Sequence, residues 1–115
     1  MNLNQIIDVL QLTPLTQAVD YQQVEPASGY TSDLLSCVMA GAKPGCIWVT
    51  LQAHMNIVAV ASLLEMSAVI ITEGAQPDQA TIAKADSQSI ILLSTPLPSF
   101  EVVGRLWEMG LRSSY

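Results

Sequence analysis

The only histidine of the chain, His54, lies in the stretch TLQAHMN at residues 50–56, directly after the apolar and β-branched run at residues 47–50. An imidazole titrates near neutral pH, so it can serve as a general base, as a metal ligand or as a polar contact to a bound molecule. It can equally be an ordinary loop residue. Which role applies depends on the residues that the fold brings beside it.

Metal binding is the first role that the sequence argues against. A zinc site requires three or four ligands, and the chain offers His54, two cysteines and its carboxylates. Cys37 falls inside an expected helix, and Cys46 begins an expected strand at the end away from His54. We therefore predict no metal ion and no other cofactor. Because no secretory signal precedes them, the two cysteines are expected to be free thiols.

Catalysis also finds little support. There is no G-x-S-x-G elbow for a serine triad, and Asp33 is the one aspartate expected near His54. Cys37 lies among apolar residues, a setting typical of a core position and not of a nucleophile. Asp33 and Glu73 could form a carboxylate pair, but no spacing argument sets their separation. The phosphate-binding motifs G-x-x-x-x-G-K-[ST] and G-x-G-x-x-G are absent. We predict that the chain is not an enzyme.

Composition restricts the partners. The 115 residues suffice for one domain, 1–115, and carry ten acids against four scattered bases, a net charge of −6. Nucleic acid and anionic membranes require clustered Lys and Arg, so neither is expected as a partner. The chain begins without a basic segment followed by an apolar one, and it has no apolar stretch long enough to cross a bilayer. A cytoplasmic protein is expected.

Half of the residues are hydrophobic and only 12% are charged, which favours a homodimer that covers apolar surface. The C-terminal segment carries an apolar stripe with Trp107 that is typical of a helix packed on a core. Its extra width around Leu106, Met109 and Leu111 is compatible with a dimer face.

Helices and strands alternate along the chain after residue 29. Residues 13–29 are expected to be mostly loop, with a short edge strand around 17–21. The strands are predicted at 46–50, 67–72 and 89–94, and the helices at 2–12, 32–40, 56–64, 77–85 and 99–110. Ser32, Asn56 and Ser99 are expected to cap three of these helices. Because the strands are apolar throughout, both of their faces must be covered, which predicts a three-layer α/β/α domain with a mainly parallel sheet.

Ligands of such sheets bind beyond the carboxyl ends of the strands, where helix N-termini gather. The residues that follow the strands are hydroxyls, amides, the imidazole and two carboxylates, Asp33 and Glu73. The predicted ligand-binding residues are Ser32, Asp33, Thr50, Gln52, His54, Asn56, Thr72 and Thr95. Gln52 and His54 stand out, because capping a helix does not explain them, although a solvent-exposed loop would.

From residue 29 onward the sequence resembles the small DRTGG-type domains related to the N-terminal domain of HPr kinase/phosphorylase. The most specific part is TLQ-x-H-x-NIVAVA, and residues 1–28 match only loosely. The resemblance rests on GYTSDLLS at 29–36, IWVTLQAHMNIVAVA at 47–61, AVIITEG at 68–74, Pro77, the strand at 90–95 and Phe100. Two features depart from the family. The D-R-T-G-G string is absent, and Cys37 stands where similar chains more usually carry an aspartate.

The resemblance implies an α/β/α domain that accompanies regulatory modules, such as CBS-domain proteins and phosphotransacetylases, and that dimerises. It implies no kinase activity, because the catalytic residues of HPr kinase lie in a separate domain. The leading hypothesis is therefore a non-catalytic regulatory or sensory domain that binds a small polar or anionic ligand, with nucleotides among the candidates. A protein-interaction module without a small ligand is the alternative, and a small enzyme that uses His54 as base is the third. The sequence does not identify the ligand, the protein partner or the pathway.

Overall fold

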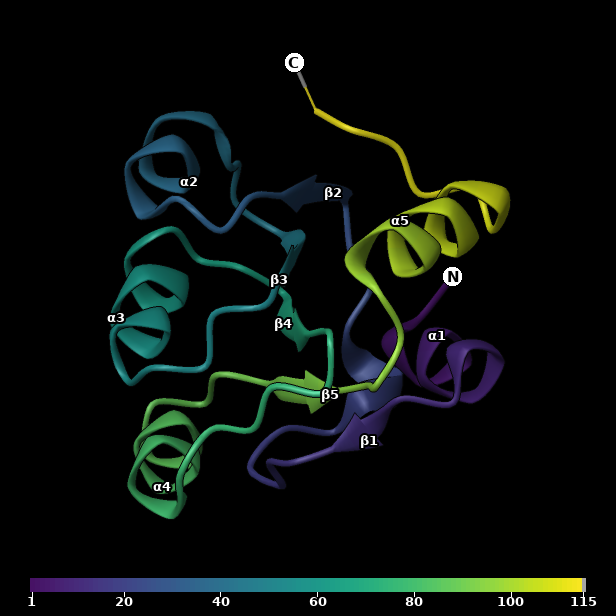
Figure 1. The fold of residues 1–115 in the computed structure, drawn as a ribbon. Coiled ribbons are helices and arrows are strands. Elements are labelled where there is room, and N and C mark those ends of the chain that lie inside the picture. The colour runs from purple at the N-terminus through teal and green to yellow at the C-terminus, as the bar shows by residue number, and fades with distance from the viewer. Residues whose placement is uncertain (115) are drawn as a thin grey trace.

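The computed structural model describes residues 1–114, which form a five-stranded sheet between two layers of helices (Figure 1). The strand order is β1-β5-β4-β3-β2. The strands are β1 (Thr13–Pro14), β2 (Ser28–Thr31), β3 (Cys46–Thr50), β4 (Ala68–Ile71) and β5 (Leu92–Ser94). The helices are α1 (Leu3–Leu10), α2 (Leu35–Gly41), α3 (Asn56–Leu63), α4 (Gln79–Ser87) and α5 (Ser99–Glu108), and a 3₁₀ turn, η1, spans Tyr21–Gln23. The predicted three-layer α/β/α fold is confirmed.

Strands β2 to β5 are parallel, and only the two-residue β1 runs antiparallel, beside β5. Each parallel strand is followed by a helix. Helices α2, α3 and α4 cover one face of the sheet, while α1 and α5 cover the other (Figure 1). All four strand-to-helix turns therefore lie along one edge of the sheet, where a binding site was expected.

The central strands are buried on both faces, which explains why they lack a polar alternation. On β3, Ile47 and Val49 point into the core under α1 and α5, whereas Trp48 points into the core under α2, α3 and α4. All five residues of β3 and all four of β4 are buried. A strand with two buried faces has no place for a polar side chain before its end.

The N-terminal third differs from the prediction. No strand forms at 17–21. The edge strand is β1, and the parallel strand β2 occupies residues that were expected to be mostly loop. The sequence around β2, Ser28-Gly29-Tyr30-Thr31, lacks an apolar run because this strand pairs on only one side, with β3. Its pairing with the buried β3, and not local propensity, makes it a strand.

The predicted dimer stripe is also corrected. Leu106 and Leu111 are buried in the core on the α5 face of the sheet, and Met109 is partly buried against the same core. These side chains are therefore committed to the domain itself. Trp107 remains half exposed. Across residues 1–114 no helix is both long and apolar enough to cross a membrane.

Candidate functional site

Three buried threonines mark the carboxyl ends of neighbouring strands. Thr50 ends β3, Thr72 follows β4 and Thr95 follows β5, and each is at most 4% exposed. The backbone N–H of Thr72 donates to the carbonyl of Thr50 at 2.9 Å, and that of Thr95 donates to the carbonyl of Ile71 at 3.0 Å, at the end of β4. The structure thus brings these three predicted site residues into one row. Because their side chains are buried, they lie beneath the exposed residues at this edge of the sheet, and we call them its base.

Asp33 connects the first two turns along this edge. One of its carboxylate oxygens, Oδ1, accepts from the Thr50 hydroxyl at 2.8 Å and from the backbone N–H of Leu51 at 2.9 Å. The Gln52 side-chain amide donates to the carbonyl of Asp33 at 2.9 Å, and the Gln52 N–H donates to the Thr50 hydroxyl. Asp33, Thr50 and Gln52 therefore form one hydrogen-bonded group that fixes the turns after β2 and β3.

The three predicted helix caps are wrong in detail. The Ser32 hydroxyl accepts from the N–H of Leu34, which closes a turn before α2, and Leu34 is the residue at the helix cap. The backbone carbonyl of Ser32 instead accepts from the indole N–H of buried Trp48 at 2.9 Å. This bond holds the Ser32 backbone against β3, while the Ser32 side chain bonds within its own turn.

Asn56 does not cap α3 either. Its backbone N–H donates to Nδ1 of His54 at 3.3 Å, so the imidazole takes the acceptor role that a capping side chain would have. The two side chains are both exposed. The charge of His54 is also a minor cause of the lowered pKa of Asp78, the carboxylate at the start of α4.

Ser99 lies inside α5, and Pro98 occupies the cap position. The Ser99 hydroxyl shares a 2.6 Å hydrogen bond with the hydroxyl of Thr72, and the Ser99 N–H donates to the Glu73 carboxylate at 2.7 Å. Thr95 accepts from the N–H of Leu97 and so shapes the turn that enters α5. The second half of the edge thus has its own side-chain hydrogen bonds, and the backbone bond from Thr72 to Thr50 joins it to the Asp33 group.

We use the term carboxyl rim for the exposed and half-exposed polar side chains that surround this base. Five of them come from the predicted set: Ser32, Asp33, Gln52, His54 and Asn56. Two further carboxylates, Glu73 and Asp78, complete the rim. Glu73 was recognised beside β4 but not chosen, and Asp78 was missed. Asp78 is the N-cap of α4, and its carboxylate accepts from the N–H of Thr81 at 2.8 Å. The Pro77-Asp78 pair before a helix was the signal that indicated it.

The rim is acidic. It carries three carboxylates and one imidazole, and the four Lys and Arg residues of the chain belong to other parts of the sequence. No group of three His, Cys, Asp or Glu side chains within residues 1–114 is arranged to hold a metal ion. Both cysteines are free, Cys37 exposed and Cys46 buried, and burial raises the pKa of the Cys46 thiol.

Comparison with known proteins gives a structural neighbour. No protein-family model matches the sequence, and no curated protein matches it. The fold is similar to a crystal structure described as the CBS and DRTGG domains of the regulatory region of Clostridium perfringens pyrophosphatase complexed with its activator, diadenosine tetraphosphate. The TM-score is 0.73 at 21% sequence identity, over 90% of this chain and 44% of that one. The chain thus spans less than half of the length of this neighbour.

At this level of identity the comparison shows a shared fold. The chain shares the fold of part of that structure, which agrees with the α/β/α fold that the DRTGG-type resemblance of residues 29 onward implies. The comparison does not extend to HPr kinase, so that relation stays a prediction.

The Asp33 network gives a first prediction. In Asp33→Ala the buried Thr50 hydroxyl and the Leu51 N–H lose their acceptor. We expect the free energy of unfolding, measured by urea denaturation, to fall by about 1 to 2 kcal/mol. Asp33→Asn, which keeps one oxygen, should lose less. Asp8→Ala removes a carboxylate from the exposed side of α1 and is the matched control. An Asp33→Ala variant as stable as this control would contradict the network.

A second prediction concerns acid. The backbone N–H of Thr81, then its hydroxyl, and also the charge of His54 lower the pKa of Asp78 below its ordinary 3.8. A carboxyl whose folded pKa is depressed stabilises the fold above its unfolded pKa, and this contribution is lost as the pH falls through the folded value. Asp78→Asn should therefore be less stable than the wild type at pH 7 and equal to it at the acid end of a pH series of denaturation curves. A constant difference across that series would contradict the assignment.

Proposed function

We propose that this domain is a non-catalytic regulatory module that binds a small polar ligand at the carboxyl rim and that acts as a homodimer. The observation that carries the proposal is the fold, which is similar to that of a pyrophosphatase regulatory region crystallised with an activator nucleotide. A nucleotide is therefore the first ligand class to test. The candidate contacts on this chain remain Ser32, Asp33, Thr50, Gln52, His54, Asn56, Thr72 and Thr95.

The chemistry of the rim supports a particular orientation of such a ligand. Asp33, Glu73 and Asp78 would repel phosphate groups, but carboxylates accept well from sugar hydroxyls and from amino groups of a base. The amides of Gln52 and Asn56 can both donate and accept, as a base edge requires. We propose that the ligand presents its base or sugar to the rim and leaves its phosphates in solvent.

The hydrogen bonding of His54 supports binding over catalysis. Its Nδ1 accepts from the backbone N–H of Asn56, which orients the ring without pairing it to a nucleophile. A general base in nucleophilic catalysis needs a hydroxyl or thiol within hydrogen-bond reach. Within residues 1–114, the imidazole forms its hydrogen bond with this backbone N–H and not with a hydroxyl or thiol. The Nε2 side of the ring can then contact a ligand.

Calorimetry tests the ligand. The protein is titrated with diadenosine tetraphosphate, ATP, AMP and adenosine, and we expect at least one to bind. Gln52→Ala and His54→Ala should each weaken that binding by about three- to tenfold, since one hydrogen bond contributes about 1 kcal/mol. Gln88→Ala, at the opposite end of α4, is the matched control and should bind normally. Silence with all four compounds, or equal loss in the control, would contradict the proposal.

A second candidate function is favoured by a different observation. Four large apolar side chains are exposed beside the same rim: Leu34, Leu51, Met55 and Phe100, of which Phe100 is 91% exposed. They come from the turns before α2 and α3 and from the first turn of α5. Apolar side chains gathered on a polar surface are typical of a protein interface. The rim is then the contact surface of an interaction module, with a second copy of the chain as its partner.

Sedimentation velocity tests this second candidate. If the rim joins two copies, Phe100→Ser should shift the dimer toward monomer at micromolar concentration. Leu63→Ser, which replaces an exposed leucine at the C-terminal end of α3, should leave the dimer intact. A monomeric wild type, or a dimer that tolerates Phe100→Ser, would exclude dimerisation through the rim. Calorimetry on Phe100→Ser then shows whether ligand binding is separate from assembly.

A further inference from the structure

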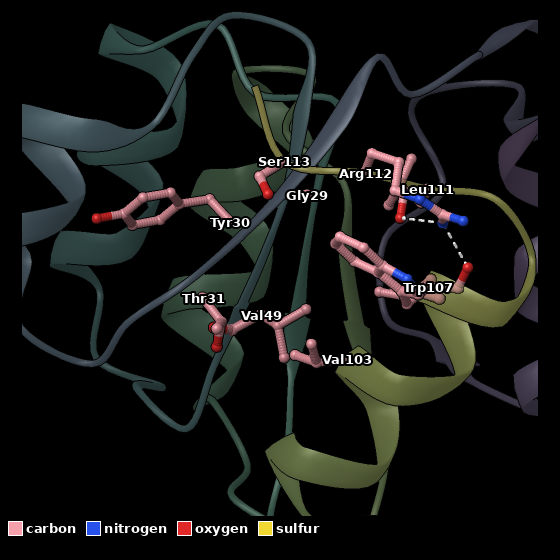
Figure 2. A pocket seen from close by; sticks show the side chains of 10 residues that line it. Gly29, Tyr30, Thr31, Val49, Val103, Trp107, Leu111, Arg112 and Ser113 are labelled. Carbon is pink, nitrogen blue, oxygen red and sulfur yellow. Dashed lines mark hydrogen bonds between the residues drawn. The ribbon is translucent and has the colours of Figure 1, made fainter. Parts of the chain in front are cut away.

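A cavity of about 180 Å³ lies between the edge strand β2 and helix α5, and none of its lining residues belongs to the carboxyl rim (Figure 2). We call it the β2–α5 groove. Its floor is formed by Gly29, Thr31 and Val49, and its walls by α5 and by the segment that follows α5. Figure 2 shows Tyr30 pointing out of the groove on the far side of the strand, and its hydroxyl donates to the carbonyl of Cys37. The groove is therefore open along the edge of the sheet.

The absence of a side chain at Gly29 keeps this space empty. A Cβ at this position would lie 3.3 Å from Cδ2 of Leu111, tighter than an ordinary contact. α5 contacts both β3 and the edge strand β2. Trp107 on α5 remains half exposed, whereas Val102 and Leu106 on the same helix are buried. The groove thus presents an aromatic surface that the domain leaves uncovered.

One positive charge lies in the wall. The Arg112 guanidinium is 4.3 Å from the centroid of the Trp107 ring, and its Nη1 donates to the carbonyls of Trp107 and Leu111 at 2.6 and 3.3 Å. Stacking and these two bonds hold the group in place. The groove contains no acidic side chain among its lining residues. In a chain with net charge −6 this is a locally positive site.

The backbone of β2 adds a donor. The N–H of Gly29 donates to the carbonyl of Arg112 at 3.0 Å, so this N–H points away from β3 and toward the groove. Along a strand, N–H groups alternate in direction, so the N–H of Thr31 points to the same side as that of Gly29. Thr31 itself lines the groove. A ligand there meets a polar edge as well as an apolar wall.

The size of the groove limits what it can hold. A cavity of about 150 Å³ is large enough for a benzene ring. We propose that the β2–α5 groove binds a small ligand with one flat ring and one anionic group, a carboxylate or a phosphate. The ring packs against Trp107 and the apolar floor, and the anion pairs with Arg112. This site is independent of the carboxyl rim and of the function proposed for it.

The two tryptophans make the test site-specific. Trp48 is fully buried under the opposite layer of helices, whereas Trp107 borders the groove, so their indole N–H signals report on different places. The protein is titrated with benzoate, phenyl phosphate and neutral benzyl alcohol, and both signals are followed by NMR. Because ligands of about ten non-hydrogen atoms bind weakly, affinities near the millimolar range are expected. The Trp107 signal should saturate with benzoate, phenyl phosphate or both, and the preferred anion identifies the group that the site takes.

Arg112→Gln removes the charge and keeps a donor. It should weaken binding of the preferred anion by about three- to tenfold, as expected for an exposed ion pair, and leave benzyl alcohol unchanged. Arg105→Gln removes an arginine from the same helix region, paired with Glu101 on the surface, and should have no effect. An unchanged Trp48 signal shows that both variants are folded.

Three results would overturn the proposal. The first is a Trp107 signal that does not saturate with either anion. The second is equal binding by Arg112→Gln and Arg105→Gln. The third is a set of NMR signal shifts confined to Gln52, His54 and their neighbours, which would show that the anion binds at the carboxyl rim instead.

Discussion

Burial of the two central strands on both faces is the constraint on which the rest of the structure depends. β3 and β4 contribute nine buried residues, and the side chains of each strand alternate between two separate cores. The gain in free energy from removing this apolar surface from water is the largest favourable term in a domain of this size. It also excludes polar side chains from the strands, so that polar groups appear only where a strand ends.

The row of threonines follows from that exclusion. Thr50, Thr72 and Thr95 are still buried, and a buried hydroxyl needs a hydrogen-bond partner. Thr50 finds one in Asp33 of a neighbouring turn, Thr72 in Ser99 at the start of α5, and Thr95 in the N–H of Leu97 in its own turn. The hydrogen bonds that satisfy the ends of the sheet are therefore the same bonds that fix the turns above them. A rim held in this way can present Gln52 and His54 in one arrangement, which is the property that a binding site needs.

The two concentrations of exposed apolar surface on the molecule differ in their charge. The carboxyl rim combines Phe100 and Leu34 with carboxylates, whereas the β2–α5 groove combines Trp107 with Arg112. These surfaces therefore favour different partners, since the rim repels anions and the groove attracts them. Both lie where helices leave part of the sheet uncovered. The carboxyl rim lies at the ends of the strands, and the β2–α5 groove lies at the edge strand β2.

How much of this was visible in the sequence depends on how local each signal is. The apolar runs at β3, β4 and β5 are continuous, so the strands, the parallel sheet and the rim residues after them could be predicted from local pattern. β2 could not, because Ser28-Gly29-Tyr30-Thr31 has no such run and becomes a strand by pairing with β3. The caps at Ser32, Asn56 and Ser99 were placed by residue type, but each of these residues bonds instead to a group brought close by the fold or the local turn.

The sequence by itself determined the fold class, the order of helices and strands after β2 and the edge of the sheet where polar residues collect, because those depend on hydrophobic pattern along the chain. Only the tertiary structure decided which rim residues are structural, that Leu106 and Leu111 belong to the core, and that Trp107 and Arg112 border a cavity with Gly29. These facts depend on contacts between residues far apart in sequence. A one-dimensional pattern carries no record of such distances.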